Sequence, residues 1–191
     1  MKDKIFKIFN ESAENISNVS KDHYLIASME KVVALSSEAF NNNQRILFCG
    51  NGGSAADAQH IAAELSGRFL KERKALFAEA LHVNSSYLTA VANDYGFEYT
   101  YSRILEATGR KGDVLIGLST SGNSLNVINA LKKAKKIGMK TIGFTGKDGG
   151  KMCDFCDIVF NIPSSNTARI QEAHILLGHT LCQLIEENLF D

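Results

Sequence analysis

Hydrophobic residues in the first forty positions recur with a helical spacing. Apolar side chains fall every three to four positions among charged residues over 5–19, and the pattern is repeated over 22–42. This spacing is typical of amphipathic helices. Three asparagines at 41–43 end the second run. We therefore expect two helices before the first strand.

Short, wholly apolar runs follow, each bounded by turn residues. Runs without alternation are typical of strands buried on both faces of a parallel sheet. The expected strands are 45–50, 113–118, 140–144 and 157–160, with a weaker candidate at 79–83. The expected helices between and after them are 55–66, 85–95, 97–108, 124–137 and 168–187.

Strands that alternate with helices indicate right-handed crossover units and a parallel sheet with helices on both faces. We expect an α/β fold in one domain spanning 1–191, with 1–43 as an N-terminal helical extension. In such sheets ligands bind beyond the carboxyl ends of the strands. The turns after Gly50 and Leu118 are therefore the first places to search for a site.

Composition excludes several classes of protein. Lys plus Arg and Asp plus Glu are both 21 in 191 residues, so the net charge is zero. That balance disfavours a duplex nucleic-acid binder or a polybasic membrane-surface protein. We expect no membrane span, because no apolar run approaches the roughly 18 residues that a bilayer requires. We expect no signal peptide, because Lys4 and Lys7 interrupt the apolar residues of the N-terminus. The four cysteines are too few for a disulfide scaffold, so we expect reduced thiols and a cytoplasmic protein.

The turn 119–124, Ser-Thr-Ser-Gly-Asn-Ser, places four hydroxyls between a buried strand and a helix. Hydroxyls, free backbone N–H groups and the helix dipole converge there, as binding of a phosphate monoester requires. No lysine lies in this turn, which separates it from nucleotide P-loops. The alternative is a helix start with more capping groups than it needs.

The turn after the first strand, Gly50-Asn-Gly-Gly-Ser-Ala55, matches a loose dinucleotide-binding fingerprint. The fingerprint also needs an acidic residue at the end of the second strand. The nearest acid, Glu72, lies in a polar segment instead. We therefore disfavour a dinucleotide, although the glycines still allow a ligand to approach the backbone closely.

Two helices carry polar stripes that suggest one site. His60 and Glu64 are four positions apart and share a helix face, while Gln171 and His179 are eight apart on an otherwise apolar helix. Together they offer nitrogen and oxygen ligands of the kind that zinc accepts. The alternative for His60 and Glu64 is a surface ion pair. Glu172 and His174 lie off the stripe, and we expect them on the surface or behind the site.

Two further motifs carry little chemistry on their own. Cys153 and Cys156 form a single CxxC pair with no second pair, which argues against a structural zinc ribbon. We interpret these thiols as buried or incidental. The run Asn93-Asp-Tyr-Gly96 is typical of a helix end.

The run Cys49–His60, the turn 119–124 and Arg169-Ile-Gln-Glu-x-His with His179 match one set of motifs. On these residues the whole chain resembles the sugar isomerase (SIS) domain family. Within that family it is most similar to the enzymes that convert sedoheptulose 7-phosphate to D-glycero-D-manno-heptose 7-phosphate for lipopolysaccharide or capsule synthesis.

The resemblance implies a five-stranded parallel sheet and a homotetramer with active sites at subunit interfaces. It implies one zinc per subunit, held by His60, Glu64, Gln171 and His179. The substrate contacts that it implies are Asn51, Gly52, Gly53, Glu64, Arg68, Asn93, Asp94, Ser119, Thr120, Ser121, Ser124 and Gln171.

Interconversion of an aldose and a ketose moves one proton between adjacent carbons and another between their oxygens, so it needs a base and an acid. We assign Glu64 as the base and His179 as the acid. If Glu64 also binds the metal, either it shifts during turnover or the metal is mainly organisational. The alternatives are a non-catalytic protein with this domain, binding a replication initiator or sensing sugar phosphates, and another sugar-phosphate isomerase or lyase.

Overall fold

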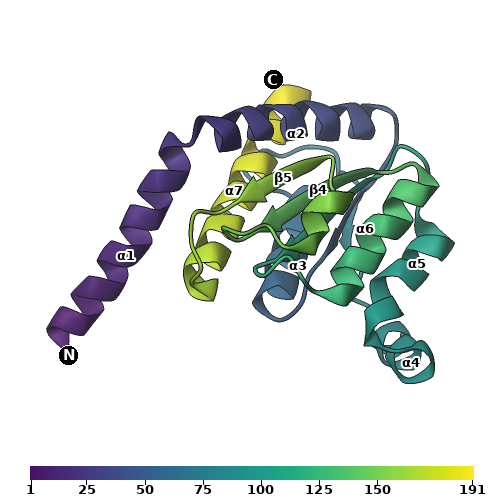
Figure 1. Cartoon of the computed structure of the whole chain (residues 1–191). Coiled ribbons are helices and arrows are strands. Elements are labelled where there is room, and N and C mark those ends of the chain that lie inside the picture. Colours follow the sequence, from purple (N-terminus) through teal and green to yellow (C-terminus); the bar gives the residue numbers. More distant parts are fainter.

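Five short strands pair in parallel to form one sheet (Figure 1). The computed structural model describes all residues, 1–191. The strand order is β2-β1-β3-β4-β5, so both motif-bearing turns follow adjacent central strands. Phe48 in β1 pairs with Ile116 in β3, which in turn pairs with Ile142 in β4. The strands are β1 Ile46–Cys49, β2 Ala78–Ala80, β3 Val114–Ser119, β4 Lys140–Thr145 and β5 Ile158–Asn161. The expected α/β class and five-stranded sheet are confirmed.

Seven α-helices surround this sheet, close to the expected positions. They are α1 Lys2–Lys21, α2 His23–Asn41, α3 Gly53–Ser66, α4 Ser85–Tyr95, α5 Thr100–Thr108, α6 Leu125–Ile137 and α7 Thr167–Phe190. The single helix expected over 97–108 is wrong, because a 3₁₀ turn at Phe97–Tyr99 precedes α5. A second 3₁₀ helix, Lys151–Phe155, includes Cys153 and was not expected. The expected helix end at Gly96 is confirmed, with φ +102° at that residue.

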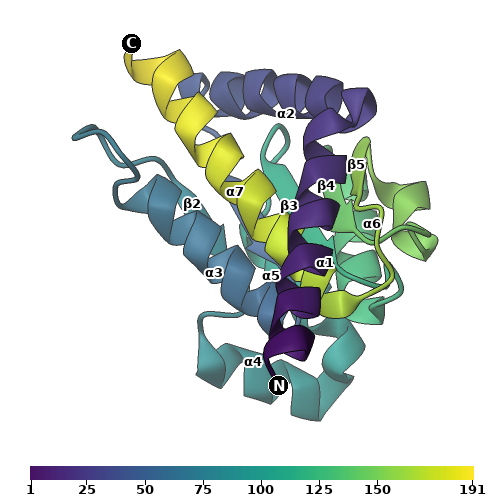
Figure 2. The same cartoon turned by 90° about the vertical axis from the view of Figure 1, so that its left-hand side faces the viewer.

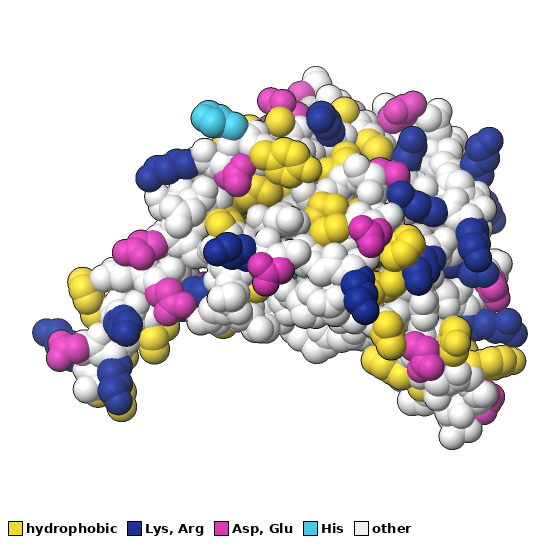
Figure 3. Space-filling model, in the orientation of Figure 1, with side chains coloured by type: hydrophobic (Ala, Val, Ile, Leu, Met, Phe, Trp, Pro, Cys, Tyr) yellow, Lys and Arg dark blue, Asp and Glu magenta, His cyan; other side chains and the backbone are white.

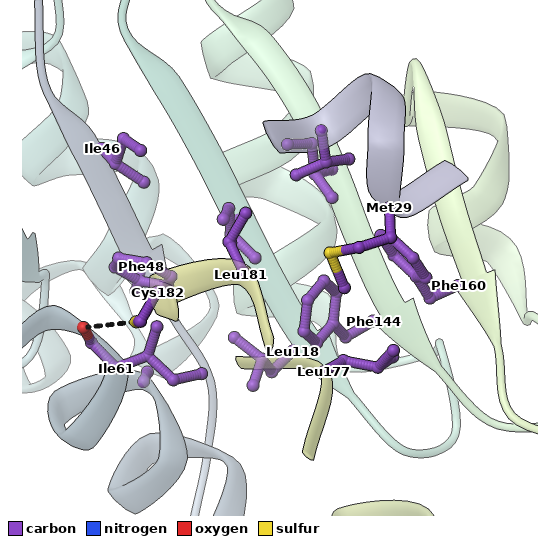
Figure 4. Packing of buried hydrophobic residues seen from close by; sticks show 14 of the residues in the cluster. Met29, Ile46, Phe48, Ile61, Leu118, Phe144, Phe160, Leu177, Leu181 and Cys182 are labelled. Carbon is purple, nitrogen blue, oxygen red and sulfur yellow. Dashed lines mark hydrogen bonds between the residues drawn. The ribbon is translucent and has the colours of Figure 1, made fainter. Parts of the chain in front are cut away.

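Helices cover both faces of the sheet and bury two hydrophobic clusters. On one face α2, α3 and α7 pack on residues that include Phe48, Ile116 and Phe144 (Figure 4). On the other face α5 and α6 pack on Leu47 and Leu115. Successive strand residues thus point into different clusters, as expected for strands buried on both sides.

Helices α3 and α7 run side by side in the same direction (Figure 2). A methyl group on Gly53 would meet the side chain of Gln171, and His60 reaches His179 two turns further along both helices. The Cys182 thiol points to the carbonyl of Ile61 at 3.8 Å (Figure 4). This parallel pair brings residues more than a hundred positions apart in sequence to one surface.

Of the two places expected for His174, on the surface or behind the site, the structure excludes the surface. Its side chain is fully buried in α7, beside Phe144, with Nε2 at 3.3 Å from the carbonyl of Thr145. Nδ1 has no hydrogen-bond partner. The spacing of polar residues on α7 indicated that His174 does not lie on the face that carries Gln171 and His179. The face that carries His174 packs on the sheet rather than pointing to solvent. Burial lowers the pKa of His174 from 6.5 to about 4.

Helix α1 projects from the body as an arm (Figures 1 and 3). All of its first ten residues are exposed to solvent. Among them, Phe6 is 68% exposed and Phe9 is 69% exposed. Its second half is anchored by Asn15, whose amide donates to the carbonyl of Arg169 at 2.9 Å. None of the helices has the length and apolar character needed to cross a membrane.

Candidate active site

The two glycine- and serine-rich turns meet where the strand order reverses. β1 and β3 are neighbours in the sheet. The connection after β1 leads to β2 on one side of this pair, and the connection after β3 leads to β4 on the other side. Asn51 after β1 and Asn126 in α6 exchange amide hydrogen bonds of 2.9 and 2.8 Å. In open α/β sheets ligands bind at such a switch point. The position of both turns therefore supports one shared site.

The first turn begins α3 without a side-chain cap. The helix expected over 55–66 starts two residues earlier, at Gly53, and Gly52 precedes it at φ +55°. Ser54 is buried. A Cβ on Gly53 would lie 2.5 Å from Nε2 of Gln171, so only glycine allows this side chain to lie across the helix start. The free N–H groups of this helix start lie beside the site.

The second turn has the geometry of an anion site at the start of α6. Ser119 and Ser124 Oγ atoms lie 3.0 Å apart, and Ser124 makes no side-chain cap to the helix. A hollow of about 290 Å³ opens beside the turn. It is lined by Thr120, Ser121, Asn123, Lys147, Asp148, Ser164, Ser165, Thr167 and Ile170. Lys147 adds a positively charged side chain, which the turn itself lacks. Its place beside the turn follows from the pairing of β3 with β4, which the sequence alone does not give.

Three of the four residues on the polar stripes lie in one cluster. Nε2 of His60 is 3.1 Å from Oε1 of Glu64 and 3.2 Å from Nε2 of His179. The ligand atoms of all three lie within 4.8 Å of one another. Gln171 is eight residues before His179, about 12 Å along α7 at 1.5 Å per residue, with its amide against Gly53. The surface ion pair considered for His60 and Glu64 is present, but His179 joins it from a second helix.

This donor set fits a metal ion such as zinc. Tetrahedral zinc binds imidazole nitrogen and carboxylate oxygen at about 2.0–2.2 Å, which separates neighbouring ligand atoms by about 3.3 Å. The contacts of 3.1 and 3.2 Å around Nε2 of His60 match that spacing. The cluster is also accessible, since the side chain of His60 is 49% exposed.

Two side chains beside the cluster were not singled out by the sequence. Asp57 lies one turn before His60 on α3, and its Oδ2 is buried without a hydrogen-bond partner. Burial raises the pKa of Asp57, and the charge of His60 partly opposes this. The ring of Phe69 stacks on His179 with centroids 5.7 Å apart. The i, i+3 spacing of Asp57 and His60 was visible in the sequence, whereas the contact of Phe69 depends on a loop.

Arg68, Asn93 and Asp94 lie outside these contacts. Arg68 is exposed just after α3 and pairs with Glu72 at 3.6 Å. Asn93 and Asp94 are exposed on the last turn of α4, where the amide of Asn93 donates to the carboxylate of Asp94 at 2.9 Å. Within one chain, the structure therefore does not bring these three residues into contact with the cluster.

All four cysteines are free thiols. Cys49 and Cys182 are buried, and Cys153 and Cys156 are partly buried. Burial raises the pKa of Cys156 to about 12, so its thiol stays protonated and weakly reactive at neutral pH.

Comparison with known proteins identifies similar sequences and structures. Residues 8–146 match the family model described as SIS domain. The chain is 52% identical over 189 residues to the phosphoheptose isomerase of Aliarcobacter butzleri, covering 99% of both chains. It is 61% identical over 151 residues to the phosphoheptose isomerase of Nitratiruptor, covering 79% of this chain and 81% of that one. The structure of phosphoheptose isomerase from Neisseria gonorrhoeae superposes with a TM-score of 0.91 at 44% identity, covering 97% of this chain and 98% of that chain.

Proposed function

The chain belongs to the SIS domain family, and from this premise we propose that it isomerises sedoheptulose 7-phosphate to D-glycero-D-manno-heptose 7-phosphate. The names of its relatives, which match nearly the full chain, support this reaction. The observation that carries the proposal is the cluster of His60, Glu64 and His179 beside a hydroxyl-rich turn at the switch point of the sheet. The product would serve as a heptose precursor for lipopolysaccharide or capsule.

The reaction needs two proton transfers and no external oxidant. Glu64 removes the proton from C1 of the ketose, which gives a 1,2-enediol, and returns a proton to C2. His179 moves the proton between O1 and O2, so that the aldehyde forms at C1 and the hydroxyl at C2. A positioned acid and base typically accelerate such steps by about 10² to 10⁴ each.

We propose that the cluster holds one zinc ion per subunit, with His60, Glu64 and His179 as ligands. Gln171 is proposed as the fourth ligand, and its amide, which lies against Gly53, would have to turn toward the cluster to bind the ion. When bound, zinc supplies Lewis-acid polarisation of the sugar oxygens. The two ligand-to-ligand distances around His60 support this assignment. Since Glu64 is both ligand and base in the proposal, either its carboxylate shifts during turnover or the metal is mainly organisational.

The phosphate is assigned to Ser119, Thr120, Ser121 and Ser124, with Asn51, Gly52 and Gly53 contacting the sugar from the first turn. The free N–H groups at the start of α6 and the hydroxyls support an anion here. Arg68, Asn93 and Asp94 are assigned to the sugar as well. Their contacts within one chain lie outside the cluster, which agrees with a site that a second subunit completes.

We therefore propose a cytoplasmic homotetramer with active sites at subunit interfaces. Exposed apolar side chains on α1, among them Ile5, Phe6 and Phe9, and others around α4, including Tyr95 and Phe97, support association. The free thiols agree with a reducing compartment. Light scattering on the purified protein tests the assembly, and a monomer at micromolar concentration would contradict it.

Incubation with sedoheptulose 7-phosphate, following the aldose product with and without a chelator, tests the function. We expect turnover that falls when the metal is removed and returns with zinc. Tight binding of the sugar phosphate without any product would instead favour a non-catalytic sensor. Turnover of a different sugar phosphate at a higher kcat/KM would identify another isomerase.

A further inference from the structure

The imidazole of His179 is bordered by aromatic rings from two different elements. The ring of Phe69 stacks on it with centroids 5.7 Å apart and planes 27° apart. His60 meets it edge-on at 5.0 Å and 65°. Phe69 belongs to the segment 67–77, which joins α3 to β2 along the edge of the molecule (Figure 2). A segment without regular structure thus covers a side chain assigned to catalysis.

One carboxylate from α7 holds this segment. Glu186 accepts hydrogen bonds from the backbone N–H groups of Phe69 at 3.1 Å, Leu70 at 2.8 Å and Lys71 at 3.0 Å. It also accepts a bond of 2.7 Å from Nε of Arg73. Glu186 lies seven residues, or two turns, after His179, so both side chains leave α7 on the same side. The backbone of Phe69 is therefore fixed relative to the helix that carries His179.

The guanidinium of Arg73 extends this arrangement to α3. It donates to the carbonyls of Glu64 at 2.8 Å, Leu65 at 2.9 Å and Gly67 at 3.2 Å. The side chains of Arg73 and Glu186 are each only 1% exposed. Burial alone would raise the pKa of Glu186, but the backbone N–H groups and Arg73 outweigh it and lower the pKa. The pair is thus ionised, and it joins the end of α3, the loop and α7.

A buried ion pair of this kind is weak evidence for stability, because the desolvation of both charges offsets their attraction. Its hydrogen bonds are directional, however, and apart from the bond between the two side chains they end on the backbone of the loop and of the end of α3. Apolar packing of similar volume would hold the helices together but would not determine where the ring of Phe69 lies. The contacts therefore favour a role in geometry over a role in stability.

We propose that Phe69 is a positioning residue for His179, and that Glu186 and Arg73 hold its ring in place. The ring covers one face of the imidazole, restricts its rotation and excludes water from that side. This inference rests on the proposed function, in which His179 moves the proton between the sugar oxygens. Misplacement of a catalytic group by about 1 Å can cost as much as 10²-fold in rate.

The test compares Phe69→Ala with Phe69→Tyr and with the matched control Leu70→Ala. Leu70 is the next residue, its side chain is 66% exposed, and only its backbone contacts Glu186. We expect Phe69→Ala to lower kcat for sedoheptulose 7-phosphate by roughly 10- to 100-fold with KM within about twofold, since the ring orients His179 rather than the substrate. Phe69→Tyr retains the stack and should restore kcat to within about threefold of wild type, while Leu70→Ala should not change it.

The second readout does not depend on turnover. In protein labelled at histidine, the ring protons of His179, assigned by comparison with His179→Gln, should shift in Phe69→Ala because the ring current of Phe69 is lost. They should stay in place in Leu70→Ala. If the His179 signals do not move in Phe69→Ala, the stack is absent and the proposal is wrong. If they move while kcat stays within twofold of wild type, the ring has no positioning role.

The role of the ion pair is tested by Glu186→Gln alone and combined with Phe69→Ala. Residues that act through one another are not additive. We therefore expect the double variant to have nearly the kcat of Phe69→Ala, whereas multiplied losses would show that Glu186 acts by another route. A wild-type protein that leaves sedoheptulose 7-phosphate unchanged would contradict the proposed function, and the histidine spectra would still show whether Phe69 orients His179.

Discussion

Gly178 on α7 lies directly against Ile61 on α3. A methyl group on Gly178 would stand 2.4 Å from Cδ1 and 2.5 Å from Cγ1 of Ile61, whose side chain is fully buried (Figure 4). The next residue on α7 is His179, and the preceding residue on α3 is His60. Because Gly178 has no side chain, α3 and α7 can approach closely enough to place Nε2 of His60 and Nε2 of His179 3.2 Å apart.

We predict that Gly178→Ala destabilises the protein by about 1–3 kcal/mol, the usual cost of an added methyl group in a packed core. It should also weaken zinc binding, because the helices must separate. Ile61→Val removes Cδ1 and should recover part of both losses in the double variant. Urea unfolding and zinc titration measure these effects. Additive losses in the double variant would show that the two residues do not compete for the same space.

The acid–base assignment predicts that Glu64→Gln and His179→Gln each lower kcat by at least about 100-fold. Both changes keep the size of the side chain but remove the group that takes or gives the proton. Steady-state assays with sedoheptulose 7-phosphate measure the loss. Glu38→Gln and His23→Gln on α2, far from the cluster, are matched controls that should retain activity. Turnover within tenfold of wild type in either site variant would contradict the assignment.

The metal assignment predicts about one zinc per chain in protein purified without a chelator, held by nitrogen and oxygen ligands. His60 contacts both other members of the cluster, so His60→Ala should lose the ion. Elemental analysis of both proteins measures the content. If the wild-type protein is fully active without metal, the metal assignment is contradicted, and these residues act as acid and base without an ion.

The phosphate assignment predicts that Ser121→Ala combined with Ser124→Ala weakens substrate binding by about 3 kcal/mol, since a hydrogen bond to a charged group contributes roughly 1.5–3 kcal/mol. That corresponds to more than about 100-fold in Kd. Calorimetric titration measures the affinity. Ser124 makes no side-chain cap to α6, so the variant should remain folded. Unchanged affinity in folded protein would move the phosphate to the turn Gly50–Ser54.

The buried His174 predicts a loss of stability in acid. Its folded pKa, about 4, lies below the ordinary value of 6.5, so protons bind preferentially to the unfolded chain. The stability is fully present above pH 6.5 and is lost as the pH falls toward 4. Between pH 7 and pH 5 this group alone should cost about 2 kcal/mol, at 1.36 kcal/mol per pKa unit.

Urea unfolding of wild type and His174→Gln over this pH range, at equal metal load and protein concentration, measures that contribution. The slope of stability against pH should be shallower in the variant, whatever its absolute stability. His23→Gln, at an exposed histidine on α2, is the control and should keep the slope of wild type. Equal slopes in His174→Gln and wild type would contradict the prediction.

Residues with local signals were predictable from the sequence, and residues placed by the fold were not. Spacing alone placed His60 with Glu64 and identified the hydroxyls of 119–124, because both features lie within one or two helical turns. The contact of His60 with His179 could be suspected but not located, since it depends on how closely α3 and α7 pack at Gly178.

Three features could not be read from the sequence, each for a physical reason. His174 lies off the polar stripe as expected, but whether it is exposed or buried depends on which face of α7 meets the sheet. Lys147 lines the hollow beside the turn 119–124 only because β4 pairs with β3. Phe69 reaches His179 only because Glu186 accepts hydrogen bonds from three backbone N–H groups of an irregular loop. Bonds to the backbone do not depend on the residue types of the loop, so the sequence contains no pattern that predicts them.

The α1 arm has a consequence for the hydrogen exchange of the protein. Isolated helices shorter than about 12–15 residues are marginal in water. The first ten residues of α1 are all exposed, although Arg169 donates to the carbonyl of Ile8 and Asn166 to the carboxylate of Glu11. In a dissociated subunit their amides should exchange within seconds, while the amides near the anchored Asn15 exchange far more slowly. If the proposed tetramer covers Phe6 and Phe9, that exchange should slow on assembly, and the exchange rate of the first three turns would then measure the fraction of assembled protein.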